Sequence, residues 1–219
     1  MSRTVVHKLR GRPTSDGAGV RMTRVIGTPA LDHFDPFLLL DEFRSDDPDD
    51  YIAGFPDHPH RGFETVTYML AGRMKHGDNQ GNTGLLGPGS VQWMTAGRGI
   101  VHSEMPEQQD GLMWGFQLWA NLPASHKMMN PRYQEIKARQ IPEVTLENGA
   151  VIKVICGHGH LELHSRIGSV PVFMAGSTAH QLIAARIEDI APSFDNRRAP
   201  AVLHHWLDGE LISGEYPWP

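Results

Sequence analysis

The chain has 219 residues, of which 40% are hydrophobic, and this is enough to bury a core in one large β-barrel domain or in two small ones. Its formal net charge of −5, without a dense Lys/Arg block, argues against direct nucleic-acid binding. The start of the chain has no apolar signal region, and no segment approaches the roughly 18 uninterrupted apolar residues of a membrane span, so we expect a cytoplasmic protein.

Short apolar runs punctuated by 23 Gly and 16 Pro predict an all-β protein, made of many short strands joined by turns. In chain order, the acidic segment 44–50 is expected to be a solvated loop. Residues 63–70, FETVTYML, predict a strand. Its odd-numbered residues from Thr65 to Met69 lie on one face, and its even-numbered residues from Val66 to Leu70 lie on the other.

Residues 84–104 predict three strands, separated by a turn at Pro88 and Gly89 and by a glycine bend at residues 97–99. The bend leads into the strand that carries His102. Residues 112–122, LMWGFQLWANL, predict a core strand, because every second side chain on one face is apolar. The other face is mixed and carries one amide, Gln117, which we take as a candidate pocket residue.

Two motifs have the spacing of metal ligands. HPHRGFE places His58 and His60 two residues apart with Glu64 behind them, and GRGIVHSE places His102 and Glu104 two residues apart. In an extended strand, residues i and i+2 point to the same face, so each pair can direct both side chains at one point. Two such strands would supply three imidazoles and a carboxylate, and would leave positions open for dioxygen or a chelating substrate.

The second motif decides between two interpretations of the first. In a chain with 13 histidines, an isolated pair two residues apart is more often solvent-facing or hydrogen-bonded than metal-bound. The second motif, about forty residues further on, shifts the balance to a metal site. Glu64 is either a ligand or a residue that orients a ligand imidazole, and we favour the orienting role because His102 and Glu104 are available.

The donor set limits the choice of metal. The single cysteine, Cys156, leaves only nitrogen and oxygen ligands. Imidazoles and a carboxylate favour iron(II), manganese, nickel or copper over calcium or magnesium, but they do not choose among these four.

The chain from Leu31 to about Gly157 resembles the pirin family of the cupin superfamily. The matching stretches are DPFLLLDEF (Asp35 to Phe43), HPHRGFETVTYML (His58 to Leu70), GSVQWMTAGRGIVHSEMP (Gly89 to Pro106) and GFQLWANLP (Gly115 to Pro123). The resemblance implies a double-stranded β-helix barrel, usually as two stacked cupin domains, with one divalent metal, typically Fe(2+), in the N-terminal barrel.

The resemblance also implies which residues form the site. By motif, the metal ligands fall on His58, His60, His102 and Glu104. Pirins generally use the glutamate at the position of Glu104 instead of the general cupin glutamate, whose position Glu64 occupies. The likeness further suggests that Phe55 and Arg61 line the cavity mouth.

Pirins resemble quercetinases, which open a flavonol such as quercetin with O2 and release CO. On this hypothesis the chain is an enzyme, a metal-dependent quercetin 2,3-dioxygenase, in which Glu104 also accepts the proton of the substrate's 3-hydroxyl. The alternative is a metal-binding regulatory protein that contacts a protein partner, since some pirins are transcriptional coregulators. A third possibility is a metal-binding barrel without activity.

The tail departs from the family. From His158 onward the sequence shows no convincing second cupin, and about sixty residues is short for another complete barrel. We expect a metal-binding cupin domain over residues 1–140 and a short, atypical region over residues 141–219. This bicupin-derived region would be an abbreviated second cupin, or the result of truncation or a reading-frame change near Gly157.

The tail also contains a competing metal site. On one face of a strand it would group His158, His160, Glu162 and His164. The blander interpretation is an exposed histidine-rich stretch, which we favour because no partner segment supplies a second set of ligands.

Overall fold

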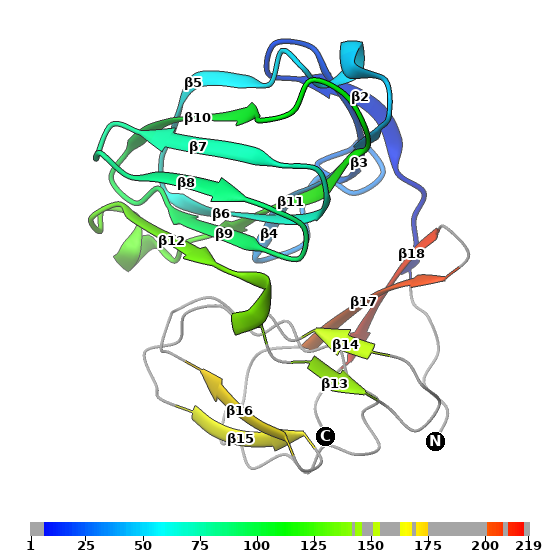
Figure 1. The fold of residues 1–219 in the computed structure, drawn as a ribbon. Helices are drawn as coiled ribbons and strands as arrows, with labels where there is room; N and C mark the ends of the chain where they lie inside the picture. Colours follow the sequence, from blue (N-terminus) through cyan, green and yellow to red (C-terminus); the bar gives the residue numbers. More distant parts are fainter. Residues whose placement is uncertain are drawn as a thin grey trace. The chain divides into compact units, whose positions relative to one another are not determined.

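The computed structural model describes residues 7–141, 143–145, 151–153, 163–167, 170–174, 201–207 and 210–216 (Figure 1). The chain falls into two compact units, one formed by Gly11–Gln140 and the other by Met1–Arg10 together with Ile141–Pro219. Strands dominate the described residues and pair in antiparallel sheets, which confirms the predicted all-β class. The helices among these residues are three-residue 3₁₀ turns, none of them long or apolar enough to cross a bilayer.

The first unit contains a seven-stranded sheet in the order β12-β9-β6-β11-β4-β3-β2. Its strands are β2 (Arg12–Asp16), β3 (Val20–Ile26), β4 (Phe37–Ser45), β6 (Phe63–Ala71), β9 (Val91–Thr95), β11 (Met113–Asn121) and β12 (Arg132–Ile136). The predicted strand 63–70 is β6, which pairs with β9 on one side and with β11 on the other. As a result, Thr67 lies between Gln92 of β9 and Gln117 of β11.

A four-stranded sheet, in the order β5-β10-β7-β8, faces the seven-stranded one (Figure 1). Its strands are β5 (Phe55–His60), β7 (Met74–Asp78), β8 (Thr83–Leu86) and β10 (Ile100–Pro106). Polar side chains of the two sheets meet between them at Glu104 of β10. The largest apolar cluster also lies in this unit and comprises Val20, Met22, Phe43, Tyr51, Phe55, Met69, Met74, Leu86 and Met113.

The predicted glycine bend separates β9 from β10. Gly97 and Gly99 both have positive φ angles, of 51° and 141°, which L side chains rarely adopt. A Cβ atom at Gly97 would also lie 2.2 Å from the carbonyl oxygen of Met129. The bend therefore requires glycine at Gly97 for both reasons, and it delivers the chain into the strand that carries His102 and Glu104.

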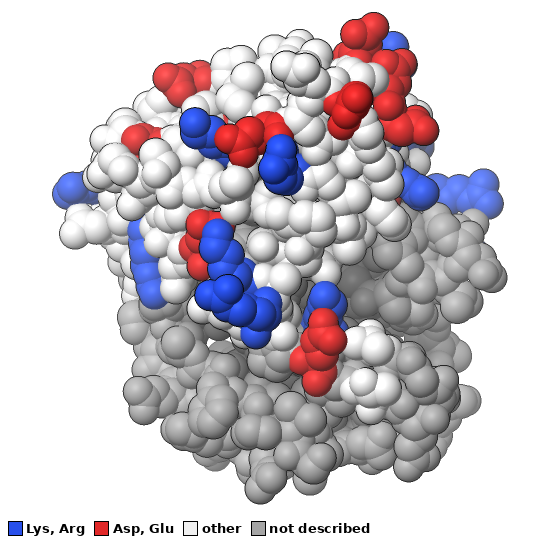
Figure 2. Space-filling view, viewed as in Figure 1, with Lys and Arg blue, Asp and Glu red and all other residues white. Residues whose placement is uncertain are grey.

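The acidic segment 44–50 is more ordered than the loop expected from its sequence. Its first residues end β4, and Pro48–Asp50 form the 3₁₀ helix η1. The side chain of Asp47 caps this helix by accepting a hydrogen bond from the backbone N–H of Asp49 at 3.1 Å. Figure 2 shows acidic side chains gathered at the end of the barrel where η1 lies in Figure 1, so the expected solvation of this segment is observed.

The second unit contains short sheets. The strands are β1 (His7–Lys8), β13 (Glu143–Thr145), β14 (Val151–Lys153), β15 (Leu163–Ile167), β16 (Val170–Met174), β17 (Ala201–Leu207) and β18 (Glu210–Tyr216). They form the pairs β13-β14 and β15-β16 and the three-stranded sheet β1-β18-β17. The origin of this unit as an abbreviated second cupin stays a prediction. Of the competing histidine cluster, His164 lies in β15, whereas His158, His160 and Glu162 lie outside the described residues.

Candidate metal centre

The register of β5 and β10 brings the two histidine motifs together. These strands are antiparallel neighbours in which His102 pairs with His58, and Ile100 pairs with His60. The possible ligand atoms of His58, His60 and His102 all lie within 4.8 Å of one another. The three ring centroids are 4.4 to 5.0 Å apart. The two-residue spacing thus places three imidazoles around one point, as the alternation of a strand requires.

Burial keeps two of these rings neutral. His102 is fully buried and His60 is 8% exposed, whereas His58 is partly buried. Burial, together with repulsion from the neighbouring imidazoles, lowers the pKa of His60 to about 4 and the pKa of His102 to about 3. Both rings are therefore neutral at pH 7, and the neutral ring is the form that binds a metal.

The hydrogen-bond partners show which ring nitrogens are available. Nδ1 of His58 lies 2.7 Å from the carbonyl oxygen of Pro56. A carbonyl only accepts, so this nitrogen carries the proton, and in the neutral ring Nε2 keeps its lone pair. Nε2 of His102 is buried and has no hydrogen-bond partner in the part of the chain that the structure describes. Such an unpaired atom costs about 1–3 kcal/mol, and a cation among the three imidazoles would remove that cost. The donor set therefore fits a divalent transition metal.

Glu104 is buried next to this group and is held by the facing sheet. Its Oε1 accepts hydrogen bonds from Thr67 Oγ1 at 3.0 Å and from Gln92 Nε2 at 3.1 Å. Its Oε2 accepts one from Gln117 Nε2 at 2.8 Å. Among the described residues, the group of mutually close donor atoms consists of the three histidines, without Glu104. The role of Glu104 as a fourth ligand thus stays a prediction.

Glu64 points to the other side of β6. Alternate residues of a strand face opposite sides, so Glu64 lies on the face opposite Thr67 and Glu104. Its Oε1 accepts a 2.6 Å hydrogen bond from Thr95 Oγ1 of β9. Burial raises the pKa of Glu64, although the hydrogen bond from Thr95 and the charge of Arg132 oppose the shift. The contact with Thr95 differs from the expected one, in which Glu64 orients a ligand imidazole.

A cavity of about 400 Å³ opens beside the histidines, within the range of about 300–1,000 Å³ that is typical of small-molecule sites. Phe55 and Gln117, two of the predicted pocket residues, line it. Arg61 is exposed, and its guanidinium lies 3.3 Å from the sulfur of Met128. The other lining side chains include Asp16, Met22, Asp41, Asp57, His58, His60 and Trp119.

The sequence interpretation missed four residues that contact the predicted ones. Thr67 and Gln92 pair across β6 and β9, and their contact with Glu104 depends on two facing sheets, which no local pattern reveals. His76 and Asp78 carried a usable signal, because MKHGD repeats the two-residue spacing of the histidine motifs. They lie on β7, the neighbour of β10, and His76 contacts His102.

Comparison with known proteins adds a family likeness. A family model described as Pirin matches residues 19–120, a range that contains all three histidines and Glu104. The chain is 61% identical over 155 residues to a pirin-like protein of Caulobacter vibrioides, a match that covers 71% of this chain and 56% of that protein. It is 56% identical over 168 residues to a Pseudomonas aeruginosa protein named putative quercetin 2,3-dioxygenase, with 77% of this chain and 59% of the relative covered. The chain thus spans somewhat more than half the length of these relatives.

Solved structures show the same likeness. A quercetin 2,3-dioxygenase from Acinetobacter baumannii matches with a TM-score of 0.61 and 35% identity, over 70% of this chain and 56% of that one. The bacterial pirin YhhW from Escherichia coli, in complex with nickel(II), matches with a TM-score of 0.51 and 25% identity, over 59% and 57% of the two chains. Similarity of fold therefore accompanies similarity of sequence.

Proposed function

The chain belongs to the pirin family of the cupin superfamily, and on this premise we propose that it is a metal-dependent dioxygenase that opens flavonols such as quercetin with O2 and releases CO. One observation carries the proposal. Three imidazoles converge at a point, and two of them line a cavity large enough for a small molecule. A cation held there would face a substrate held in the cavity.

His58, His60 and His102 would hold the metal, with Glu104 as a fourth protein ligand. Such nitrogen and oxygen donors suit iron(II), manganese, nickel and copper. The likeness to pirins favours iron(II), and nickel(II) is the ion of the E. coli YhhW complex. When bound, the cation supplies Lewis acidity, which makes a hydroxyl on it more acidic, and redox capacity for the reaction with O2.

Glu104 is the residue proposed to accept the proton of the flavonol 3-hydroxyl. Gln117 lines the cavity and donates to Oε2, so this oxygen is the one connected to the cavity. A carboxylate oxygen has two lone pairs, and the one that remains on Oε2 serves the metal or the substrate proton but not both, so Glu104 accepts the proton as it loosens from the metal. Thr67 and Gln92 hold Oε1 and so fix the orientation of the acceptor, as general base catalysis requires.

The cavity favours a flat, neutral phenol. Phe55 and Trp119 contribute aromatic surface against which a planar ring can pack. Asp16, Asp41 and Asp57 also line the cavity, and Arg24 bridges the first two, at 3.3 Å from Asp16 and 2.7 Å from Asp41. The three carboxylates outnumber this one guanidinium, so phenolic hydroxyls can donate to them whereas an anionic ligand would be repelled.

The regulatory alternative shares the metal centre and differs in what the centre does. A protein that signals through a partner needs bound metal but no space for a substrate. The cavity beside His58 and His60 is the observation that favours the enzyme.

The test measures O2 consumption and CO release with quercetin, using the full chain loaded with iron(II) and the same protein without metal. We expect turnover only in the loaded protein. The corresponding flavone, which lacks the 3-hydroxyl, is the matched control, and it should not turn over because Glu104 has no proton to accept. The absence of metal-dependent turnover with iron, manganese, nickel and copper would refute the enzyme and leave the two other possibilities, a regulatory protein and a metal-binding barrel without activity.

A further inference from the structure

We propose that Asp78 and His76 are positioning residues that fix His102 in the tautomer whose free nitrogen is Nε2. The inference rests on the proposed metal site, because Nδ1 of His102 is directed at His76 and Nε2 is the nitrogen left to bind a cation. Neither residue belongs to the predicted ligand set.

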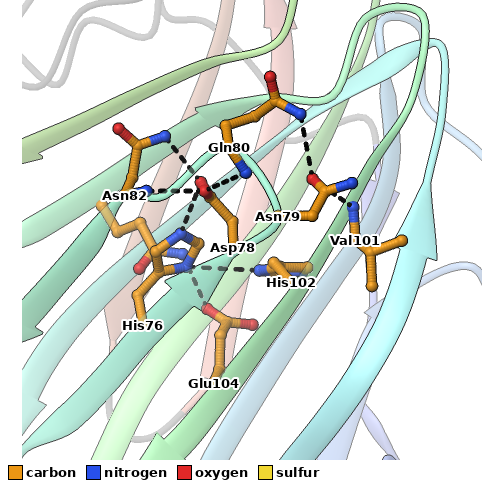
Figure 3. Close-up of polar contacts among 9 residues, drawn as sticks. His76, Asp78, Asn79, Gln80, Asn82, Val101, His102 and Glu104 are labelled. Atoms are coloured by element: carbon orange, nitrogen blue, oxygen red, sulfur yellow. Dashed lines mark hydrogen bonds and ion pairs between the residues drawn. The ribbon is translucent and has the colours of Figure 1, made fainter.

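A chain of contacts within the four-stranded sheet carries the inference. In the β7–β10 register, His102 pairs with Asp78 and Glu104 pairs with His76. Nε2 of His76 lies 3.2 Å from Oδ2 of Asp78, and Nδ1 of His76 lies 3.5 Å from Nδ1 of His102 (Figure 3). The side chains of all three residues are fully buried. Solvent therefore does not compete for these contacts.

Only one placement of protons satisfies both contacts when the two rings are neutral. The Asp78 carboxylate can only accept, so Nε2 of His76 donates to it. Nδ1 of neutral His76 is then an acceptor, so Nδ1 of His102 must donate to it. The remaining nitrogen of His102, Nε2, keeps a lone pair and is the buried atom without a hydrogen-bond partner among the described residues. The two contacts thus present a metal-binding nitrogen.

Asp78 is itself held in place by hydrogen bonds, and this fixes the direction of donation from His102 to His76 and from His76 to Asp78. Its Oδ1 accepts hydrogen bonds from the backbone N–H groups of Gln80 and Asn82, both at 2.9 Å, and its Oδ2 accepts one from Nδ2 of Asn82 at 2.9 Å. Figure 3 shows these donors converging on the carboxylate from the turn that follows β7. With three donors directed at it, Asp78 acts as an acceptor.

The plane of the His76 ring is also fixed. Tyr133 of β12 stacks on it, with ring centroids 4.3 Å apart and an interplanar angle of 16°. Gly84, the β8 partner of His76, makes room for this tyrosine, because a Cβ atom there would lie 1.8 Å from the Tyr133 hydroxyl oxygen. The arrangement matches the general rule that a metal-ligating histidine donates its other N–H group to an orienting partner.

The test begins with Asp78→Asn in the full chain. The amide can donate to Nε2 of His76, which moves the His76 proton to Nδ1 and forces the His102 proton onto Nε2, the proposed ligand atom. We expect Ni²⁺ affinity, measured by competition with a chelator, to fall by about 10–100-fold. His76→Leu should have a similar effect. His76→Gln should restore most of the affinity, because its amide oxygen can accept from Nδ1 of His102.

The matched control is Asp32→Asn. Oδ2 of Asp32 lies 3.1 Å from Nδ1 of His33 in an exposed pair, so this variant makes the same chemical change outside the site. We expect it to bind Ni²⁺ like the wild type.

A second readout needs no metal. Long-range ¹H–¹⁵N spectra of the metal-free protein, assigned with His102→Gln, report which nitrogen of His102 carries the proton. We expect Nδ1–H in the wild type and Nε2–H in Asp78→Asn. Nε2–H in the wild type would overturn the proposal, and so would an affinity loss in Asp78→Asn without a change of tautomer. Failure of the wild type to bind Ni²⁺ would instead count against the proposed function, and the spectra would still decide the tautomer.

Discussion

The β6–β9 pair buries one carboxylate against each of its faces, and the two carboxylates have different surroundings. On the inner face, which carries Thr67 and Gln92, three neutral donors hold Glu104 next to the histidines. On the outer face, Thr95 donates to Oε1 of Glu64, while Oε2 has no hydrogen-bond partner among the described residues. The parity of a residue along its strand, more than its nearness to a motif in sequence, decides whether it belongs to the site.

The largest expected effect comes from removing one of the three histidines of the candidate metal centre. His60→Ala takes away one of three imidazoles, and we expect metal affinity to fall by more than the roughly 10–100-fold that loss of an orienting partner costs. Turnover should disappear with the metal. Chelator competition and metal analysis of the purified protein measure the change.

The control for this variant is His33→Ala, which removes an exposed histidine and should leave binding unchanged. If His60→Ala kept stoichiometric metal, the ion would have to bind elsewhere. The candidate metal centre at His58, His60 and His102 would then be refuted, and the histidine-rich segment 158–164 would be the next candidate.

The second prediction compares the two carboxylates directly. Glu104→Gln removes the proposed proton acceptor while keeping its size, and we expect CO release from quercetin to fall by about 10²–10⁴-fold, the usual contribution of general base catalysis. Glu64→Gln should keep wild-type turnover, because its side chain faces away from the site. Both variants are assayed at equal metal content. Equal losses of CO release in the two variants would contradict the claim that the face of β6 on which a carboxylate lies decides whether it takes part in turnover.

The fold was predictable where local patterns suffice. The alternation of FETVTYML predicted β6, and the glycine bend predicted the entry into β10. The same alternation predicted that His58 and His60 share a face, which the structure bears out with His102 beside them. These features depend only on neighbouring residues.

The rest of the site depends on pairings between distant strands. Gln92 reaches Glu104 only because β9 lies in one sheet and β10 in the other. The spacing of His76 and Asp78 was visible, but its meaning required the β7–β10 register. A single sequence does not contain that register in any short motif.

The third prediction uses the pH dependence of the metal-free protein. Burial lowers the pKa of His60 from 6.5 to about 4, so on acidification the unfolded chain takes up the proton first. The wild type should therefore lose stability as pH falls from 6.5 towards 4, with a slope of at most about 1.4 kcal/mol per pH unit from this residue. His60→Gln lacks that slope. Urea denaturation of the two proteins at pH 7 and pH 5 measures the difference, and parallel curves would contradict the assigned burial effect.

The smallest expected effect belongs to the outer face and has the opposite sign. Burial raises the pKa of Glu64 above its ordinary value of 4.5, so the folded state holds this proton at a pH where the unfolded state has released it. The wild type should therefore lose stability, relative to Glu64→Gln, as pH rises from 4.5 through the folded pKa. Thermal unfolding across this window measures the trend, and metal affinity should not change. If the wild type instead lost stability, relative to Glu64→Gln, as pH falls, burial would not raise the pKa of Glu64.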